Sequence, residues 1–137
     1  MQYSLSSLIL CGGKGSRLKK IGKTIPKCLV KVNGEFFIKY ILTGLKNKYI
    51  KKIVVSGFHR FSILDKTLTS FKIKNLLLYN DGNISILGRI KKNLLREKTS
   101  LLVCYGDEYA NINLNKMIKD HFESKKLLTI TTIKIKS

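Results

Sequence analysis

Residues 8–18 read Leu-Ile-Leu-Cys-Gly-Gly-Lys-Gly-Ser-Arg-Leu, an apolar run that ends in a glycine-rich loop. The run belongs to a predicted strand, Ser6–Leu10. Glycines after a strand let the backbone approach a ligand closely, because no Cβ stands in the way, and successive exposed N–H groups can hold phosphate oxygens. Lys14 and Arg17 add positive charge to the same loop. The stretch therefore predicts a phosphate-binding loop at the end of the first strand.

Two better-known phosphate loops do not fit this stretch. A Walker A loop places its lysine after the second glycine, whereas Lys14 precedes Gly15. A dinucleotide-binding fingerprint needs a third glycine at the position that Leu18 occupies. If only the sequence of this loop is considered, it can equally be a glycine-rich turn that binds no ligand.

Short apolar runs alternate with amphipathic stretches along the rest of the chain. This alternation predicts an α/β domain over residues 1–137, with right-handed crossovers and a mostly parallel sheet. Ligands bind at the carboxyl ends of the strands in such sheets. Cys11–Arg17 and Gly106-Asp107 both follow predicted strands, so they should meet in one crevice. The predicted strands are Ser6–Leu10, Lys52–Ser56, Leu76–Tyr79, Leu101–Cys104 and Leu127–Ile135, and the predicted helices are Glu35–Lys46, Phe61–Ser70, Ser85–Leu95 and Asn113–Lys125.

A second stretch, 26–34, decides between a ligand-binding loop and a plain turn. Together with the first stretch it resembles the signature GGxGTRL…PKxLxxVxGxPxxxY of sugar-phosphate nucleotidyltransferases. That resemblance implies a Rossmann-like three-layer α/β/α fold, the nucleotide-diphospho-sugar transferase fold, with residues 1–137 as its nucleotide-binding portion. The matching residues are Gly12, Gly13, Gly15, Ser16 in place of threonine, Arg17, Leu18, Pro26, Lys27, Leu29, Val32, Gly34 and Tyr40.

The resemblance implies a reaction in which a sugar 1-phosphate attacks the α-phosphorus of a nucleoside triphosphate, giving an NDP-sugar and pyrophosphate. It assigns Arg17 to the β- and γ-phosphates, and Lys27 to the α-phosphate or the sugar phosphate. It also assigns the catalytic Mg²⁺ to Asp107, because the family carries a Gly-Asp after a central strand; a turn aspartate is the alternative. The other nucleotide contacts that it implies are Leu10, Cys11, Gly12, Gly13, Lys14, Gly15, Ser16 and Gly88.

Further matches point to two kinds of relative. Residues 86–91 fall where these enzymes carry a glycine-bearing segment over the base and ribose. Residues 111–114 and His121-Phe122 resemble glucose-1-phosphate cytidylyltransferases, whereas the first motif resembles heptose-1-phosphate guanylyltransferases equally well. The resemblance implies precursor synthesis for surface polysaccharides such as lipopolysaccharide or capsule, and it leaves the base and the sugar open.

The chain is strongly basic, with 27 Lys and Arg against 8 Asp and Glu and a net charge of +19. Such a balance is typical of proteins with polyanionic partners. The excess is nearly all lysine spread along the chain, so we expect compositional bias rather than a nucleic-acid surface. No apolar run is long enough for a membrane span, and three scattered cysteines indicate reduced thiols rather than a metal site. We expect a cytoplasmic protein without a membrane partner, and leave homo-oligomerisation open.

The tail Ser124–Ser137 contains no acidic residue. Members of this family are longer, and their later portion contributes the sugar pocket and a second metal-binding aspartate. The resemblance therefore predicts a truncated member. The alternative to an active transferase is an inactive nucleotide-binding module or a basic nucleic-acid-binding module on the same fold.

Overall fold

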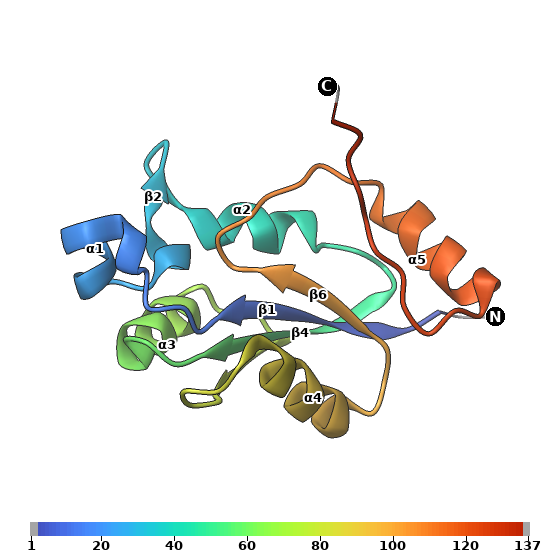
Figure 1. The fold of residues 1–137 in the computed structure, drawn as a ribbon, viewed down its shortest axis with the longest axis horizontal. Helices are drawn as coiled ribbons and strands as arrows, with labels where there is room; N and C mark the ends of the chain where they lie inside the picture. The colour runs from blue at the N-terminus through green and yellow to red at the C-terminus, as the bar shows by residue number, and fades with distance from the viewer. Residues whose placement is uncertain (1–2, 136–137) are drawn as a thin grey trace.

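The structure, a computed structural model, describes residues 3–135 (Figure 1). Strands and helices alternate as the sequence predicts. Two 3-10 turns, η1 (Ser16–Leu18) and η2 (Lys27–Leu29), lie in the long connection after the first strand. The other elements are β1 (Leu5–Cys11), α1 (Lys19–Thr24), β2 (Lys31–Val32), β3 (Glu35–Phe36), α2 (Phe37–Gly44), β4 (Ile50–Gly57), α3 (Phe61–Ser70), β5 (Leu76–Asn80), α4 (Ile86–Glu97), β6 (Leu101–Tyr105) and α5 (Leu114–Ser124).

Four strands form one parallel sheet in the order β5-β4-β1-β6, which confirms the predicted parallel sheet. The chain leaves β1 toward β4 on one side, and it returns to the other side of β1 with β6. The strand order therefore changes direction between β1 and β6. In open α/β sheets, ligands bind beside the carboxyl ends of the two strands between which this change occurs.

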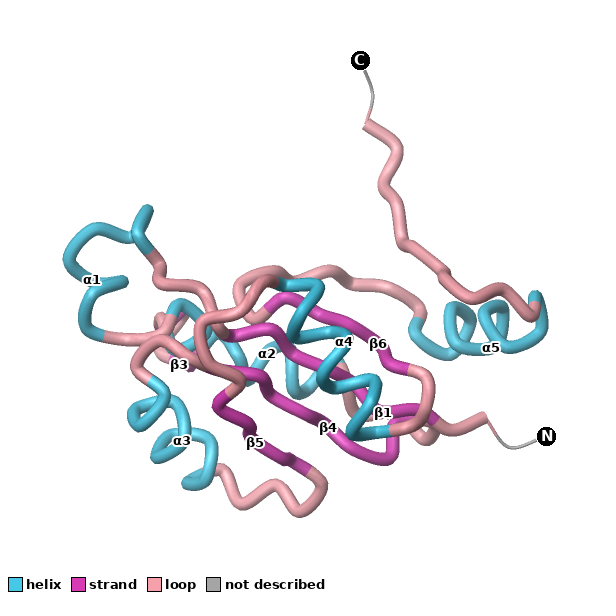
Figure 2. Tube along the Cα trace, turned by 60° about the horizontal axis from the view of Figure 1, so that its bottom comes forward, coloured by secondary structure: helices cyan, strands magenta, loops and turns pink. Residues whose placement is uncertain are grey.

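Helices cover both faces of the sheet, which confirms the three-layer α/β/α arrangement (Figure 1, Figure 2). Helix α4 crosses the strands on the side opposite α2. Along β1, Ile9 packs into the larger apolar cluster, which α2, α3 and α5 share, whereas Leu8 packs into a smaller cluster with Ile90 of α4. Both β1 side chains are 0% exposed, as expected for a central strand that is covered on both faces.

Helix α4 forms as predicted, but the sheet buries a polar side of it. The sequence pattern places Ile86, Ile90 and Leu94 on one side of the helix. In the structure Ile86 and Leu94 are 48% and 44% exposed, while Arg89 and Asn93 are buried. These polar side chains are buried because they find hydrogen-bond partners at and after the ends of β4 and β5.

The predicted fifth strand, Leu127–Ile135, does not form. Its apolar side chains are largely exposed, for example Leu127 at 104% and Ile133 at 86%. A strand needs a neighbour for its backbone N–H and C=O groups, and no strand among residues 3–135 pairs with this segment. The apolar, β-branched composition of the segment was therefore insufficient to predict a strand, because strand formation depends on a distant partner.

Candidate functional site

A crevice of about 390 Å³ lies at the carboxyl ends of β1 and β6, where the two predicted loops meet. Part of its lining consists of residues predicted from the sequence: Leu10, Cys11, Gly12, Gly13, Arg17, Lys27 and Asp107. The rest was not predicted: Cys28, Asn83, Ile84, Ile86, Arg89, Tyr105, Gly106 and Glu108.

Lys27 and Asp107 meet in this crevice although 80 residues separate them in the sequence. Lys27 Nζ donates to Asp107 Oδ2 at 2.9 Å, and the two side chains are 27% and 41% exposed. Lys27 begins η2 directly after the buried Pro26, whose ring fixes the backbone entering the turn. A partly exposed ion pair contributes little to stability. Its main consequence is that a cation and a carboxylate stand beside the glycines that follow β1.

Gly106 allows the end of β6 to approach β1 this closely. Its N–H donates to the Leu10 carbonyl at 2.9 Å. A Cβ at position 106 would lie 2.5 Å from Cys11 Sγ and 3.0 Å from the Leu10 carbonyl oxygen. Glycine is therefore required at this position, and it places Asp107 at the mouth of the crevice.

Four of the predicted site residues do not line the crevice: Lys14, Gly15, Ser16 and Gly88. Gly15 has a φ of +63° and packs closely against Gly22, so it shapes the turn into α1. The Gly88 N–H donates to Ser85 Oγ at 3.0 Å, which caps the first turn of α4. Nucleotide contacts by these four residues stay predictions.

A buried polar cluster adjoins the crevice and joins β4, β5 and α4. Asp81 directly follows β5; its Oδ2 accepts from Ser56 Oγ at 2.6 Å and from Asn93 Nδ2 at 2.9 Å. Arg96 Nη1 lies 2.8 Å from Asp81 Oδ1. Burial raises the pKa of Asp81, but the hydrogen bonds from Ser56 and Asn93 and the ion pair with Arg96 outweigh burial and hold the pKa below its ordinary value. Asp81 therefore carries a buried negative charge that this cluster stabilises.

Arg89 connects the polar cluster to the crevice. It is 4% exposed, and its Nη1 donates to Ser56 Oγ at 3.0 Å and to the Gly57 carbonyl at 3.1 Å. A Cβ on Gly12 would overlap the Arg89 guanidinium. The absence of a side chain at Gly12 thus makes room for Arg89, a role of this glycine that its sequence motif does not reveal.

The family model described as nucleotidyl transferase matches residues 6–137. The chain belongs to the nucleotidyl transferase family. This membership confirms the resemblance carried by the motifs at Gly12–Leu18 and Pro26–Gly34.

Relatives of both expected kinds occur in this family. The chain is 30% identical over 117 residues to D-glycero-alpha-D-manno-heptose 1-phosphate guanylyltransferase of Campylobacter jejuni, covering 82% of this chain and 52% of the relative. It is 28% identical over 154 residues to a probable glucose-1-phosphate cytidylyltransferase of Bacillus subtilis, covering 94% and 60%. Its fold resembles HddC of Yersinia pseudotuberculosis complexed with GMP-PN, with a TM-score of 0.73 and 24% identity over 86% of this chain and 54% of that one. The chain spans about half the length of the relatives that it matches.

The three cysteines of the chain are free thiols, as expected. Cys11 and Cys28 are buried together in the crevice wall. A hydrogen bond with Cys28, and then burial, raise the pKa of the Cys11 thiol well above its ordinary value. Burial raises the pKa of Cys104 to about 11. Cys11 and Cys104 are therefore protonated at neutral pH, which makes them poor nucleophiles and poor metal ligands.

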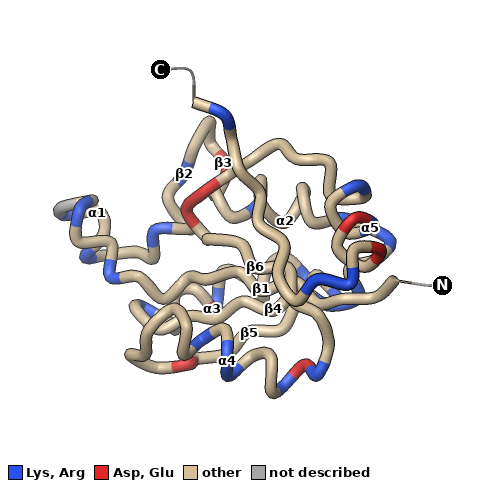
Figure 3. Tube along the Cα trace, turned by 45° about the vertical axis from the view of Figure 1, so that its right-hand side comes forward, with Lys and Arg blue, Asp and Glu red and all other residues tan. Residues whose placement is uncertain are grey.

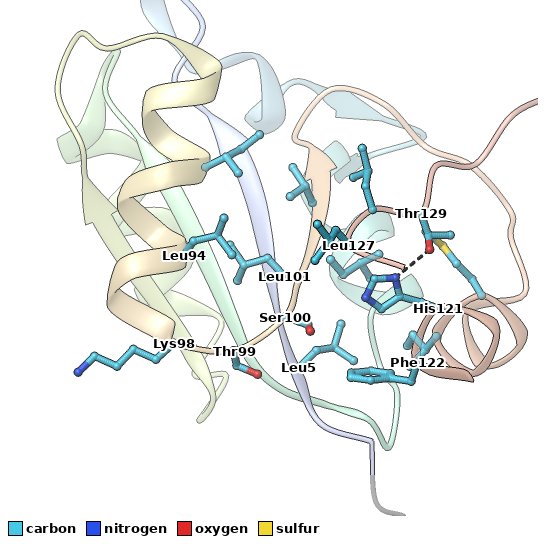
Figure 4. Close-up of a pocket in the computed structure, with 16 residues that line it drawn as sticks. Leu5, Leu94, Lys98, Thr99, Ser100, Leu101, His121, Phe122, Leu127 and Thr129 are labelled. Atoms are coloured by element: carbon cyan, nitrogen blue, oxygen red, sulfur yellow. Dashed lines mark hydrogen bonds between the residues drawn. The ribbon is translucent and has the colours of Figure 1, made fainter. Parts of the chain in front are cut away.

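A larger pocket of about 550 Å³ lies between α4 and α5 along the outer edge of β6 (Figure 4). Its lining is mostly apolar and includes Leu94, Leu101 and Leu127. His121 and Thr129 also line it, with His121 Nδ1 and Thr129 Oγ1 2.8 Å apart. Phosphoryl chemistry needs converging charges, and the charged residues of the crevice do not reach this pocket. In this member of the nucleotidyl transferase family, the crevice is therefore the candidate active site.

Basic residues are distributed widely over the nucleotidyl transferase fold. Figure 3 shows Lys and Arg along α1, α4 and α5 and in the connecting loops, not gathered on one element. This distribution agrees with the scattered lysines of the sequence. None of the helices within residues 3–135 is both long enough and apolar enough to cross a membrane.

Proposed function

We propose that this protein transfers a nucleoside monophosphate from a nucleoside triphosphate to a sugar 1-phosphate, giving an NDP-sugar and pyrophosphate. The observation that carries the proposal is the Lys27–Asp107 pair beside Gly12 and Gly13 at the strand ends. Membership of the nucleotidyl transferase family supports the reaction class. Because the chain spans about half the length of its relatives, catalytic activity is itself part of the proposal.

Lys27 and Arg17 supply positive charge that a triphosphate needs. The Lys27 ammonium is a compact point charge that suits the α-phosphate or the incoming sugar phosphate. Arg17, exposed on η1, offers a planar fork that suits the β- and γ-phosphates. The sugar phosphate oxygen attacks the α-phosphorus, and the bond to pyrophosphate breaks. The protein then contributes by positioning the two substrates and by neutralising charge on the phosphate oxygens.

Asp107 fits a magnesium ion that is held largely by the substrate. Magnesium is usually bound by one or two carboxylates together with phosphate oxygens and waters. The Asp107 carboxylate is 41% exposed in the crevice, and Glu108 lines the same crevice. When bound, magnesium would neutralise phosphate charge. Lys27 would orient the Asp107 carboxylate before the substrate enters.

The proposal also covers which nucleotide base and which sugar the substrates carry. The backbone of Leu10–Gly13 lines the crevice and would lie against the base and ribose. The similar relatives are named as a heptose 1-phosphate guanylyltransferase and a probable glucose-1-phosphate cytidylyltransferase. We therefore propose GTP or CTP and a sugar 1-phosphate of this kind as substrates, in a cytoplasmic step toward surface polysaccharide precursors.

A pyrophosphate-release assay tests this proposal on the full chain. Each of GTP, CTP, UTP, ATP and dTTP is combined with glucose, mannose or heptose 1-phosphate, with magnesium or with EDTA. We expect pyrophosphate only when a triphosphate, a sugar phosphate and magnesium are all present, together with an equal amount of NDP-sugar. Release of phosphate in the absence of a sugar phosphate would contradict the proposal. So would the absence of turnover with every combination of triphosphate and sugar 1-phosphate.

A further inference from the structure

Strand β6 forms one edge of the sheet, and the backbone groups on its outer side have no partner among residues 3–135. On its inner side β6 pairs with β1, and the Gly106 N–H donates to the Leu10 carbonyl. Successive residues of a strand point their N–H and C=O groups to opposite sides, so those of Leu101, Val103 and Tyr105 point outward. An open edge of this kind is a template for another strand.

The pocket beside β6 separates this edge from the residues that follow α5. Leu101 and Val103 of β6 line the pocket, and so do Leu127 and Thr129 (Figure 4). Thr129 Oγ1 lies 2.8 Å from His121 Nδ1, which keeps Thr129 beside α5. A space of about 550 Å³ therefore lies between β6 and the start of the segment, and the rest of the segment extends away from the sheet (Figure 1, Figure 2).

Segment 130–135, Ile-Thr-Thr-Ile-Lys-Ile, has the composition of a strand but no neighbouring strand within residues 3–135. Five of its six residues are β-branched, which favours a pleated, half-buried strand. Its isoleucines, Ile130, Ile133 and Ile135, are 71%, 86% and 81% exposed. At about 3.3 Å per residue, the extended segment spans about 20 Å, which is enough to cover the five residues of β6. The chain thus carries an open edge and a matching strand-forming segment that it does not bring together.

We propose that two copies of this chain form a dimer by exchanging segment 130–135, each segment adding as a strand to the outer edge of β6 in the other copy. A second copy supplies the strand-forming segment that the first copy leaves unpaired. The added strand would enter the pocket and cover Leu94, Val103 and Leu128, apolar side chains that are exposed there. Because the exchange is reciprocal, it closes as a two-fold dimer and leaves neither edge open.

The surface that this exchange buries is enough for a weak specific dimer. Full burial of a leucine or isoleucine side chain removes roughly 60–120 Å² of apolar surface. The isoleucines of two segments and the pocket walls that they cover give on the order of 1,000 Å², close to the lower limit for a specific interface. The net charge of +19 on each copy opposes association, and added salt screens that repulsion. Salt should therefore strengthen this dimer, whereas it would weaken binding to an acidic partner.

Sedimentation velocity of the full chain tests the exchange, with Ile133→Lys and Leu95→Lys as matched variants. Both place a lysine at an exposed apolar position, but Leu95 lies on α4 outside the pocket. We expect the wild type to shift from monomer to dimer between about 1 and 200 µM protein, and further as salt is added. Ile133→Lys should weaken dimerisation by about tenfold or more, because its charge would enter an apolar pocket. Leu95→Lys should change dimerisation by no more than about twofold.

Amide hydrogen exchange in the wild type locates the contact. The outward amides of β6, those of Leu101, Val103 and Tyr105, should exchange more slowly in concentrated, dimeric protein than in dilute protein. A chain that stays monomeric at every concentration would overturn the proposal, as would equal effects of the two lysine variants or a dimer that salt weakens. A dimer in which these three amides stay unprotected would also overturn it, because its contact would lie elsewhere. Protection of the amides in the monomer would show that the chain's own segment covers β6, and the exchange would again be wrong.

Discussion

Asp107→Asn is expected to abolish the strengthening of triphosphate binding by magnesium. In the wild type, the Asp107 carboxylate and the phosphates should ligate the ion together. A contact that involves a charged group is worth about 2 kcal/mol, which corresponds to about thirtyfold in Kd. Without magnesium the variant should bind at least as tightly as the wild type, because Lys27 loses its competing carboxylate partner. Calorimetric titration of each protein with magnesium and with EDTA measures both effects.

Glu108→Gln is the matched control for this substitution. Glu108 is the next acidic residue and lines the same crevice, but Lys27 pairs with Asp107. The control protein should keep most of its response to magnesium. If magnesium strengthens binding equally in the wild type and in Asp107→Asn, then Asp107 is a turn residue and the metal assignment is wrong.

Asp81→Ala is expected to destabilise the fold by about 3–5 kcal/mol, because it removes one partner of a buried, charge-paired cluster. The substitution leaves Ser56, Asn93 and Arg96 without their shared acceptor. Urea unfolding followed by circular dichroism measures the change. Asp65→Ala on α3 is the control, since Asp65 is exposed and accepts from Thr69, and it should change stability by no more than about 0.5 kcal/mol. Equal, small effects of the two substitutions would show that the cluster does not stabilise the fold.

The Asp81 contribution should also depend on pH. Its pKa in the folded protein lies below the ordinary value, so the folded state favours the ionised carboxyl. The stabilisation is then present above the unfolded-state pKa of about 3.9, and it is lost as the pH falls through the folded-state pKa. The stability difference between the wild type and Asp81→Ala should therefore narrow as the pH is lowered from about 5 towards about 2. A constant difference over this range would contradict an ionised Asp81.

The position of the crevice could be predicted because it depends on local signals that act together. An apolar run followed by glycines predicts a buried strand with an accessible end, and the alternation of elements predicts parallel neighbours. Once the strands are parallel, their carboxyl ends lie at one edge of the sheet. The convergence of the loop after β1 and Gly106-Asp107 on one crevice follows from that geometry. The contact of Lys27 with Asp107 does not, because Lys27 lies on η2 and not at a strand end.

The polar cluster could not be predicted in this way. Around Arg89 the sequence shows apolar residues at helical spacing, which indicates an apolar buried side. The polar cluster joins Ser56 of β4, Asp81 after β5 and Asn93 of α4, and the hydrogen bonds of Arg89 and Asn93 to the sheet side form only when α4 packs there. The available signal was Asp81, one of only 8 acidic residues, two positions after the predicted strand Leu76–Tyr79. The segment Leu127–Ile135 was predicted wrongly for a related reason, because strand pairing depends on a distant partner that the local pattern does not reveal.

The central claim is that the crevice binds a nucleoside triphosphate as a specific ligand. Isothermal titration of the full chain with GTP, CTP, UTP, ATP and dTTP in the presence of magnesium tests it directly, with tripolyphosphate as the control for attraction to a chain of net charge +19. We expect saturable one-to-one binding of at least one nucleotide that is tighter than tripolyphosphate binding and persists when added salt screens the surface charges. If no nucleotide binds, or if each binds only as tripolyphosphate does and is released by salt, the account is contradicted.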